Sequence, residues 1–406
     1  MNRLIIVLLL FFLFVAMPIN ASERFFQFQS IDTMKMSRDT ARSKADDTSF
    51  DDEIDLEMRN IADTGATHVG IGTPYDVEFL PFLRRWVIGA RRYNLKVWFR
   101  GNFAGWEGWF GYSKINRAQH LQKISEFIHK NPDLFENGDI FTPCPECENG
   151  GPGDPRMKGD VNGHREFLIN EYEITKQAFK DLKKVVYAGF FSMNGDVARL
   201  IMDPETTART GGYVVVDHYV RTPEQLANDV KDFASRSEGK VILGEFGSPI
   251  PDIHGDQTDD QQAQWVEEAL QRLLDTKVLH GLNYWVNKGG STAIWEDNNT
   301  PHKAVGLLTG IYTPSTFNGK IQDSFEKPLA NVIIESPYSI ERSGKDGLFI
   351  MPVKGRMTVN ISKEGYRPTT FDVDESMDKK SVTITLEPVQ YNLIDQLKLF
   401  LKRIFK

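Results

Sequence analysis

The chain has 406 residues, of which 40% are hydrophobic and 26% are charged, and its formal net charge is −8. This length exceeds one ordinary domain, so we expect a large domain and a small one. The negative charge argues against a nucleic-acid partner, which usually requires a basic face. Only two cysteines are present, and neither a second cysteine pair nor an HExxH helix supplies zinc ligands. We therefore expect no disulfide scaffold, no metal and no cofactor.

The first 21 residues follow the order of a secretory signal. Arg3 precedes an apolar run over residues 4–17, and small residues follow up to Ala21 and Ser22. The run is shorter than the roughly 20 residues that a membrane-spanning helix needs. We expect cleavage after Ala21 and export of the mature chain, which is then secreted or held at the cell surface. An uncleaved anchor is the alternative.

From residue 25 to about residue 314, short apolar segments alternate with amphipathic ones, which is typical of parallel βα units. We count eight such units, and eight close most simply as a (β/α)8 TIM barrel, which we assign to residues 22–314. The expected strands are residues 25–31, 68–72, 96–100, 139–143, 185–191, 213–217, 241–244 and 281–286. The expected helices include residues 51–64, 78–93, 117–129, 163–184, 223–237 and 260–274.

The residues that follow each strand form the reactive face of such a barrel. Here these residues are polar or aromatic, and tryptophans in glycine-rich loops are good platforms for sugar rings. Alternatively, Trp106 and Trp109, which follow the third strand, only cap the top of the barrel. In strand order, the candidate residues are Arg100, Asn102, Trp106, Trp109, Glu146, Glu148, Asn149, His218, Tyr219, Glu245 and Trp285.

Glu245 is the centre of this pattern. The apolar run over residues 241–244 predicts a buried parallel strand, and it ends in this carboxylate, flanked by glycines. Carboxylates after the fourth and seventh strands suit displacement at an anomeric carbon, where an acid protonates the leaving oxygen while a carboxylate attacks the other face. These two roles require opposite pKa shifts.

The barrel resembles the clan A glycoside hydrolases, retaining (β/α)8 enzymes that include cellulases and mannanases. The resemblance rests on glutamates after strands four and seven, a His-Tyr pair after strand six and a Trp on strand eight. It implies Glu245 as the nucleophile and Glu146 as the acid/base. It further implies that His218 and Tyr219 bond near the nucleophile and that Trp285 forms the floor of the sugar subsite.

The sequence departs from that clan at the acid/base, which an asparagine normally precedes. Glu146 follows Pro145, and the alternative Glu148 follows Cys147. Cys144 and Cys147 are either a local disulfide or two reduced thiols beside the barrel mouth. We expect a retaining glycoside hydrolase that cleaves β-linked polysaccharide or oligosaccharide. The alternative is a non-catalytic carbohydrate-binding protein on a degenerate glycosidase barrel.

Beyond residue 314, strands separated by turns replace the helical period and predict a small antiparallel β-sandwich over residues 315–389. This module resembles carboxypeptidase regulatory-like domains, which implies a role in spacing or attachment. The resemblance rests on the segments 319–321, 328–332, 346–349 and 365–366. The expected strands are residues 319–323, 331–335, 348–351, 356–363 and 381–386.

Residues 390–406 form a basic amphipathic helical pattern. Such a helix can lie on an anionic membrane surface or dock on its own sandwich. The sequence gives neither the sugar and linkage nor the oligomeric state.

Overall fold

The computed structural model describes residues 23–378 and 380–389, and contacts divide the chain into two units. Arg24–Pro314 form one unit, and the described residues from Ser315 onward belong to the other. The expected signal and the expected basic helix both lie outside the described residues. Within the described ranges, every helix is too short or too polar to span a bilayer.

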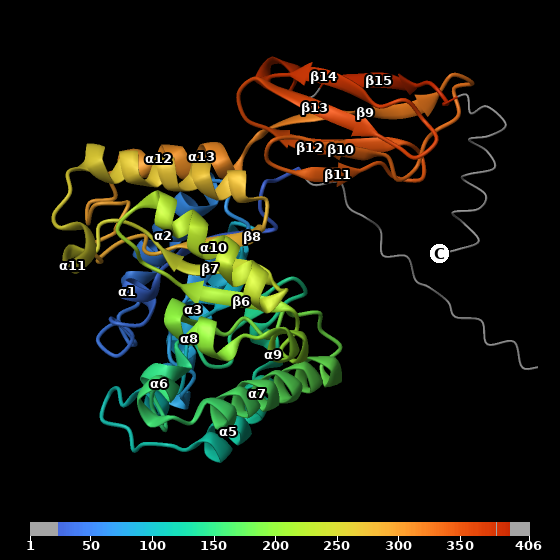
Figure 1. Cartoon of the computed structure of the whole chain (residues 1–406). Coiled ribbons are helices and arrows are strands. Elements are labelled where there is room, and N and C mark those ends of the chain that lie inside the picture. The colour runs from blue at the N-terminus through green and yellow to red at the C-terminus, as the bar shows by residue number, and fades with distance from the viewer. Residues whose placement is uncertain (1–22, 379, 390–406) are drawn as a thin grey trace, which may run out of the picture. The chain divides into compact units, whose positions relative to one another are not determined.

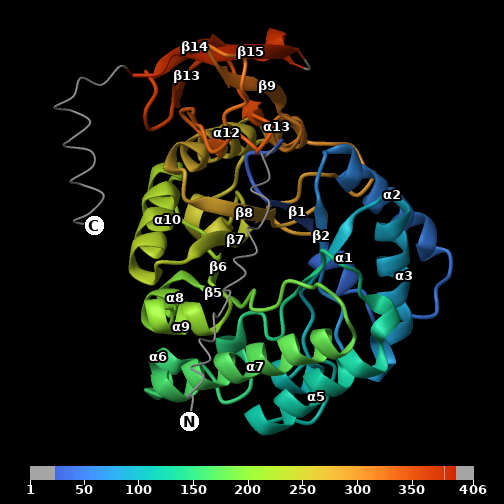
Figure 2. The same ribbon diagram turned by 90° about the vertical axis from the view of Figure 1, so that its right-hand side faces the viewer.

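The first unit contains an eight-stranded parallel sheet in the order β4-β3-β2-β1-β8-β7-β6-β5, so the TIM-barrel-like fold expected from the sequence is confirmed. Helices surround this sheet (Figure 1, Figure 2). A parallel bridge from Ile140 to Tyr187 joins the two ends. The strands are β1 (Phe28–Asp32), β2 (His68–Ile71), β3 (Lys96–Phe99), β4 (Ile140–Phe141), β5 (Ser192–Asn194), β6 (Tyr213–Asp217), β7 (Lys240–Phe246) and β8 (Leu279–Tyr284).

Several helices begin at residues whose side chains cap the first turn. Asn116 and Gln119 form a capping box at the start of α5, and Thr258 and Gln261 form another at α12. The helices are α1 (Met34–Ser37), α2 (Phe50–Asp63), α3 (Leu80–Arg92), α4 (Ala104–Glu107), α5 (Arg117–Lys130), α6 (Pro155–Lys158), α7 (Val161–Asp181), α8 (Gly195–Ile201), α9 (Pro204–Arg209), α10 (Pro223–Ser237), α11 (Pro251–His254), α12 (Asp259–Thr276) and α13 (Lys303–Tyr312). Short 3-10 turns are η1 (Val77–Phe79), η2 (Pro132–Leu134), η3 (Cys147–Asn149) and η4 (Glu375–Met377).

The barrel interior is filled by apolar side chains from strands on all sides. Phe28, Trp98, Phe190, Val215 and Ile242 form one buried cluster with Ile140. Both faces of β7 are buried, which explains why its sequence is a continuous apolar run. The strand ends above this packed interior, and its terminal carboxylate therefore lies at the mouth.

One strand prediction is wrong in position. Residues 185–191 were expected as the fifth strand, but β5 is Ser192–Asn194, and Tyr187 makes only the isolated bridge to β4. Gly189 interrupts the extended segment with φ of +83°, and a Cβ atom there would lie 2.1 Å from the carbonyl oxygen of Thr210. The apolar run is therefore divided into two pieces.

The second unit has two sheets whose side chains form one core, including Phe317, Ile334, Met351 and Ile361. One sheet has the order β11-β10-β13-β14 and the other β12-β9-β15. The prediction of a purely antiparallel sandwich is wrong, because β15 pairs with β9 in parallel. Two of these strands, β11 and β14, were not predicted. The bounds are β9 (Ser315–Asp323), β10 (Ile333–Glu335), β11 (Ile340–Arg342), β12 (Leu348–Val353), β13 (Met357–Ser362), β14 (Thr369–Val373) and β15 (Ser381–Leu386).

Candidate active site

Glu245 and Asp217 lie side by side at the end of neighbouring strands. In the register of β6 and β7, Asp217 pairs with Glu245, one step after an irregularity that follows Val216. Both residues are buried. Two carboxylates so placed repel each other, and they require a cation or a proton between them.

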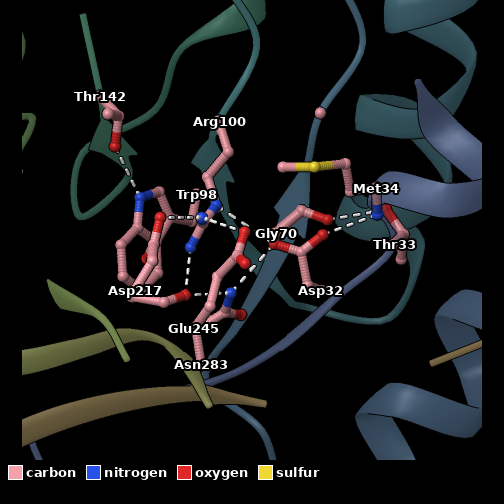
Figure 3. Close-up of polar contacts among 12 residues, drawn as sticks. Asp32, Thr33, Met34, Gly70, Trp98, Arg100, Thr142, Asp217, Glu245 and Asn283 are labelled. Atoms are coloured by element: carbon pink, nitrogen blue, oxygen red, sulfur yellow. Dashed lines mark hydrogen bonds and ion pairs between the residues drawn. The ribbon is translucent and has the colours of Figure 1, made fainter. Parts of the chain in front are cut away.

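Arg100, directly after β3, supplies that cation. Its guanidinium lies 2.7 Å from Glu245 Oε1, 3.3 Å from Asp217 Oδ2 and 3.2 Å from Asp32 Oδ2 (Figure 3). It also donates to the carbonyl of Gly244, and the indole of Trp98 lies 5.3 Å from it. Arg100 is only 2% exposed, so these charges interact in a medium far less polar than water.

Asn283 of β8 holds the other side of this cluster. Its Nδ2 donates to Asp32 Oδ2 at 3.0 Å and to the carbonyl of Gly244 at 2.8 Å. The backbone N–H of Met34 donates to the second oxygen of Asp32 at 2.6 Å. The ends of β1, β3, β6 and β8 therefore each contribute a polar group to the cluster around Glu245, as a preorganised site requires.

Burial and repulsion raise the pKa values of the paired carboxyls. Burial raises the pKa of Asp217 to about 8, opposed by Arg100 and reinforced by Glu146. Burial, and then the charge of Asp217, raise the pKa of Glu245 well above its usual value, again opposed by Arg100. Burial lowers the pKa of Arg100, but the surrounding carboxylates more than offset this, so it stays charged.

The contacts indicate which carboxyl of the pair holds the proton. Glu245 has the shorter contact with Arg100, and its other oxygen accepts a hydrogen bond from the hydroxyl of Tyr219 at 2.9 Å. Asp217 has the longer contact with Arg100, at 3.3 Å. We infer that the proton resides on Asp217 while Glu245 keeps its charge.

The expected role of His218 is wrong. Its ring lies against Phe233, and its Nε2 contacts Asp229 of α10 at 2.8 Å, away from Glu245. Successive side chains of an extended segment point to opposite faces, so Asp217 and Tyr219 face the mouth and His218 faces the helix layer. The inward partner at this strand is therefore Asp217, which we did not assign to the site from the sequence.

The loop after β4 carries the two candidate acids. Glu146 is half-buried, and its negative charge acts on Glu245, Asp217 and Arg100. Glu148 is 2% exposed, and its Oε1 accepts from the N–H of Asn194 at 2.7 Å. Burial raises the pKa of Glu148 to about 7. Asn149 is exposed in the same loop.

Cys144 and Cys147 form a disulfide, so the first of the two interpretations holds. Both residues are buried, and the bond encloses Pro145 and Glu146.

The aromatic candidates differ in accessibility. Trp106 is wrong as a sugar platform, because it is 2% exposed, stacks on Phe167 and donates from Nε1 to the carbonyl of Cys147 at 3.3 Å. It packs beneath the strand-four loop. Trp109 and Trp285 are partly exposed. The ring of Trp285 meets Tyr219 edge-on at 6.0 Å, beside the partner of Glu245.

Asn102 joins the mouth to a buried chain of polar groups. It donates to Glu107, and its Oδ1 lies 2.8 Å from Nε2 of His120, whose other nitrogen is 2.7 Å from Glu171. It does not contact Glu245 directly. Burial raises the pKa of Glu107 to about 8. Glu107 follows Trp106 in the sequence, but no spacing signal distinguishes it from a solvated glutamate.

Within residues 23–378 and 380–389, no group of three His, Cys, Asp or Glu residues is arranged to hold a metal ion.

Solved structures share the fold of this chain. A GH5_18 glycoside hydrolase variant from Bifidobacterium longum subsp. longum, in complex with Manb1-4GlcNAc, has a TM-score of 0.54 and 13% identity, covering 75% of this chain and 84% of that one. A GH5_18 protein from Streptomyces cattleya in complex with GlcNAc has a TM-score of 0.54 and 14% identity, covering 74% and 85%. No protein-family model matches the sequence, and no curated protein matches it.

Proposed function

We propose that the chain is a retaining glycoside hydrolase that cleaves β-linked polysaccharide or oligosaccharide. The observation that carries the proposal is the setting of Glu245. Its carboxyl group lies at the carboxyl end of a barrel strand and is held on one oxygen by Arg100 and on the other by Tyr219. Such a group is oriented for attack, and the shared fold of glycoside hydrolases adds support.

The acid/base is Glu146 in this proposal. The role requires a carboxyl that reaches the substrate and lies near the nucleophile, and Glu146 is half-buried with its charge acting on Glu245. Burial raises the pKa of Glu148, but one of its oxygens accepts a hydrogen bond from the N–H of Asn194 and the side chain is closed to solvent. We favour Glu146 because a general acid has to touch the leaving oxygen, and its side chain is the more exposed of the two.

The reaction has two steps. A carboxylate oxygen of Glu245 bonds to the anomeric carbon while the glycosidic C–O bond breaks and Glu146 gives its proton to the leaving oxygen. Glu146 then takes a proton from water, the water oxygen bonds to the anomeric carbon, and the ester to Glu245 breaks. Trp285 supplies a flat apolar face beside Tyr219 on which the sugar ring can lie.

The wider setting is proposed from the sequence. Residues 1–21 direct export, and the mature chain is secreted or held at the cell surface. The second unit acts as a carboxypeptidase regulatory-like spacer, and residues 390–406 contact the membrane surface or the cell envelope.

A non-catalytic carbohydrate-binding protein is the second candidate. The observation that favours it is the absence of an asparagine before Glu146, where Pro145 stands instead. In that case the mouth would bind sugar without turnover.

Reducing ends released from a substrate panel test the proposal. The panel contains β-glucans, mannans, xylans, galactans and the disaccharide Manβ1-4GlcNAc, which the structurally similar GH5_18 variant binds. Wild type is compared with Glu245→Gln, Glu146→Gln and a matched control, Glu224→Gln, at an exposed position of α10. We expect turnover by wild type and by the control only. Calorimetric binding by wild type without product would establish the binding protein instead.

A further inference from the structure

The loop that carries Glu146 is closed on itself by the disulfide between Cys144 and Cys147. The ring contains only Pro145 and Glu146 between the two cysteines. Both cysteines are buried, and Pro145 fixes a further backbone angle within the ring. The backbone around Glu146 has little freedom left.

Glu146 itself adopts a backbone conformation that glutamate rarely takes. Its φ is +41°, in the left-handed region that favours glycine. A side chain in that region persists where the surrounding structure over-determines the backbone, and such residues concentrate at functional sites.

Hydrogen bonds fix the same residue on both sides. The N–H of Glu146 donates to the carbonyl of Ser192 in β5 at 2.8 Å, and its carbonyl accepts from the N–H of Asn149 at 2.8 Å. Further along, the N–H of Asn194 in β5 donates to Glu148. The loop is therefore joined to the neighbouring strand of the barrel.

Two side chains from the loop after β3 hold the disulfide itself. Asn102 Nδ2 lies 3.8 Å from the sulfur of Cys144, and the indole of Trp106 donates to the carbonyl of Cys147 at 3.3 Å. A Cβ atom on Gly150 would lie 2.5 Å from the ring of Trp106, so the loop packs directly on the indole. This explains why Trp106 is buried at the mouth.

We propose that Cys144 and Cys147 are positioning residues, whose disulfide aims the carboxyl of Glu146 at the substrate's leaving oxygen. The proposal rests on the proposed function, in which Glu146 is the acid/base. The disulfide acts on proton transfer to the leaving group and not on sugar binding.

The double variant Cys144→Ser/Cys147→Ser tests this proposal in two independent ways. The first is hydrogen exchange of the full chain, read from peptides that cover residues 142–150 and, as reference, β7. We expect exchange of the loop amides to rise at least about tenfold while β7 keeps its protection. Equal exchange in variant and wild type would overturn the proposal, whether or not the protein turns out to be a glycosidase.

The second test compares two glycosides of one sugar, with a good and a poor leaving group. A poor leaving group needs the proton from Glu146, whereas a dinitrophenolate departs without it. The comparison uses kcat/KM, because this constant reports the first bond-breaking step, in which Glu146 acts as the acid, and not the second step, in which it acts as the base for both substrates. Because general acid catalysis contributes about 10²–10⁴-fold, we expect kcat/KM for the poor leaving group to fall at least about tenfold, with kcat/KM for the dinitrophenyl glycoside changing less than about threefold. A parallel loss on both substrates, or no loss on either, would overturn the positioning role.

Cys144→Ala/Cys147→Ala serves as a second variant, and its thermal unfolding midpoint shows whether the fold survives. If wild type hydrolyses no glycoside, the proposed function fails, and the exchange measurement still decides whether the disulfide fixes the loop.

Discussion

Replacement of Arg100 by methionine removes the cation that holds the carboxyl cluster together. Three carboxyls, Asp32, Asp217 and Glu245, contact its guanidinium. Leaving buried charges without their partner costs about 3–5 kcal/mol. We expect Arg100→Met to lower the free energy of unfolding by about this amount at pH 8.

The loss should be smaller at pH 5, and the sign follows from linkage. Asp217 and Glu245 have raised pKa values when folded, so the folded state binds more protons than the unfolded chain. Stability from such groups is present at low pH and is lost as pH rises through the folded pKa, by about 1.4 kcal/mol per pH unit and proton. Without Arg100 these pKa values rise further, so protonation at pH 5 relieves the repulsion.

Urea unfolding at both pH values measures the effect, with Arg92→Met as the matched control. Arg92 pairs with Asp55 at 3.2 Å on the surface, where its side chain is 61% exposed, so its loss should cost no more than about 1 kcal/mol. Adding Asp217→Asn to Arg100→Met should recover part of the stability. An Arg100→Met protein as stable as wild type at pH 8, or equally weakened at both pH values, would refute the reasoning.

Three further substitutions probe the mouth. Asp217→Asn replaces a carboxyl that already holds the proton with a neutral amide, so the acidic limb of the kcat/KM profile should stay where it is; a limb moved to lower pH would show that Asp217 carries a charge beside Glu245. Tyr219→Phe removes a hydrogen bond to a charged oxygen, worth about 1.5–3 kcal/mol, and steady-state kinetics should show kcat reduced about 10–100-fold. His218→Ala should lower the unfolding free energy by about 1–3 kcal/mol in urea titration while kcat changes less than about twofold, because the ring bonds away from the mouth; a larger kinetic loss would contradict that placement.

The fold was largely predictable because its signals are local. Thr222 caps α10 and Pro223 occupies its first turn, so the helix begins where the sequence indicates. The apolar run before Glu245 predicts a strand buried on both faces, and β7 is buried in this way. The apolar residues 185–191 led to a wrong strand prediction because the extended segment breaks at Gly189. This break depends on the carbonyl of Thr210, which is close in space but far along the chain, so the periodicity of the segment does not show it.

The site was predictable only in part, for a related reason. Glu245 and Tyr219 could be found from strand ends, but the choice of His218 over Asp217 ignored the alternation of side chains along a strand. Arg100 was only a minor candidate, because nothing in the sequence indicates that three distant carboxyls converge on it. The parallel pairing of β15 with β9 likewise depends on the tertiary structure, because the pattern of residues in each strand does not determine which strand it pairs with or in which direction.

Trapping of the glycosyl-enzyme tests the central claim most directly. The purified chain is incubated with 2-deoxy-2-fluoro dinitrophenyl β-glycosides of glucose, mannose, xylose and galactose, which slow the second step so that the ester accumulates. We predict a mass increase of one fluorosugar, located by peptide mass spectrometry on Glu245 and absent from Glu245→Gln. Turnover of a glycoside without any label, or a label on a different carboxylate such as Glu146, would contradict the assignment of Glu245 as the nucleophile.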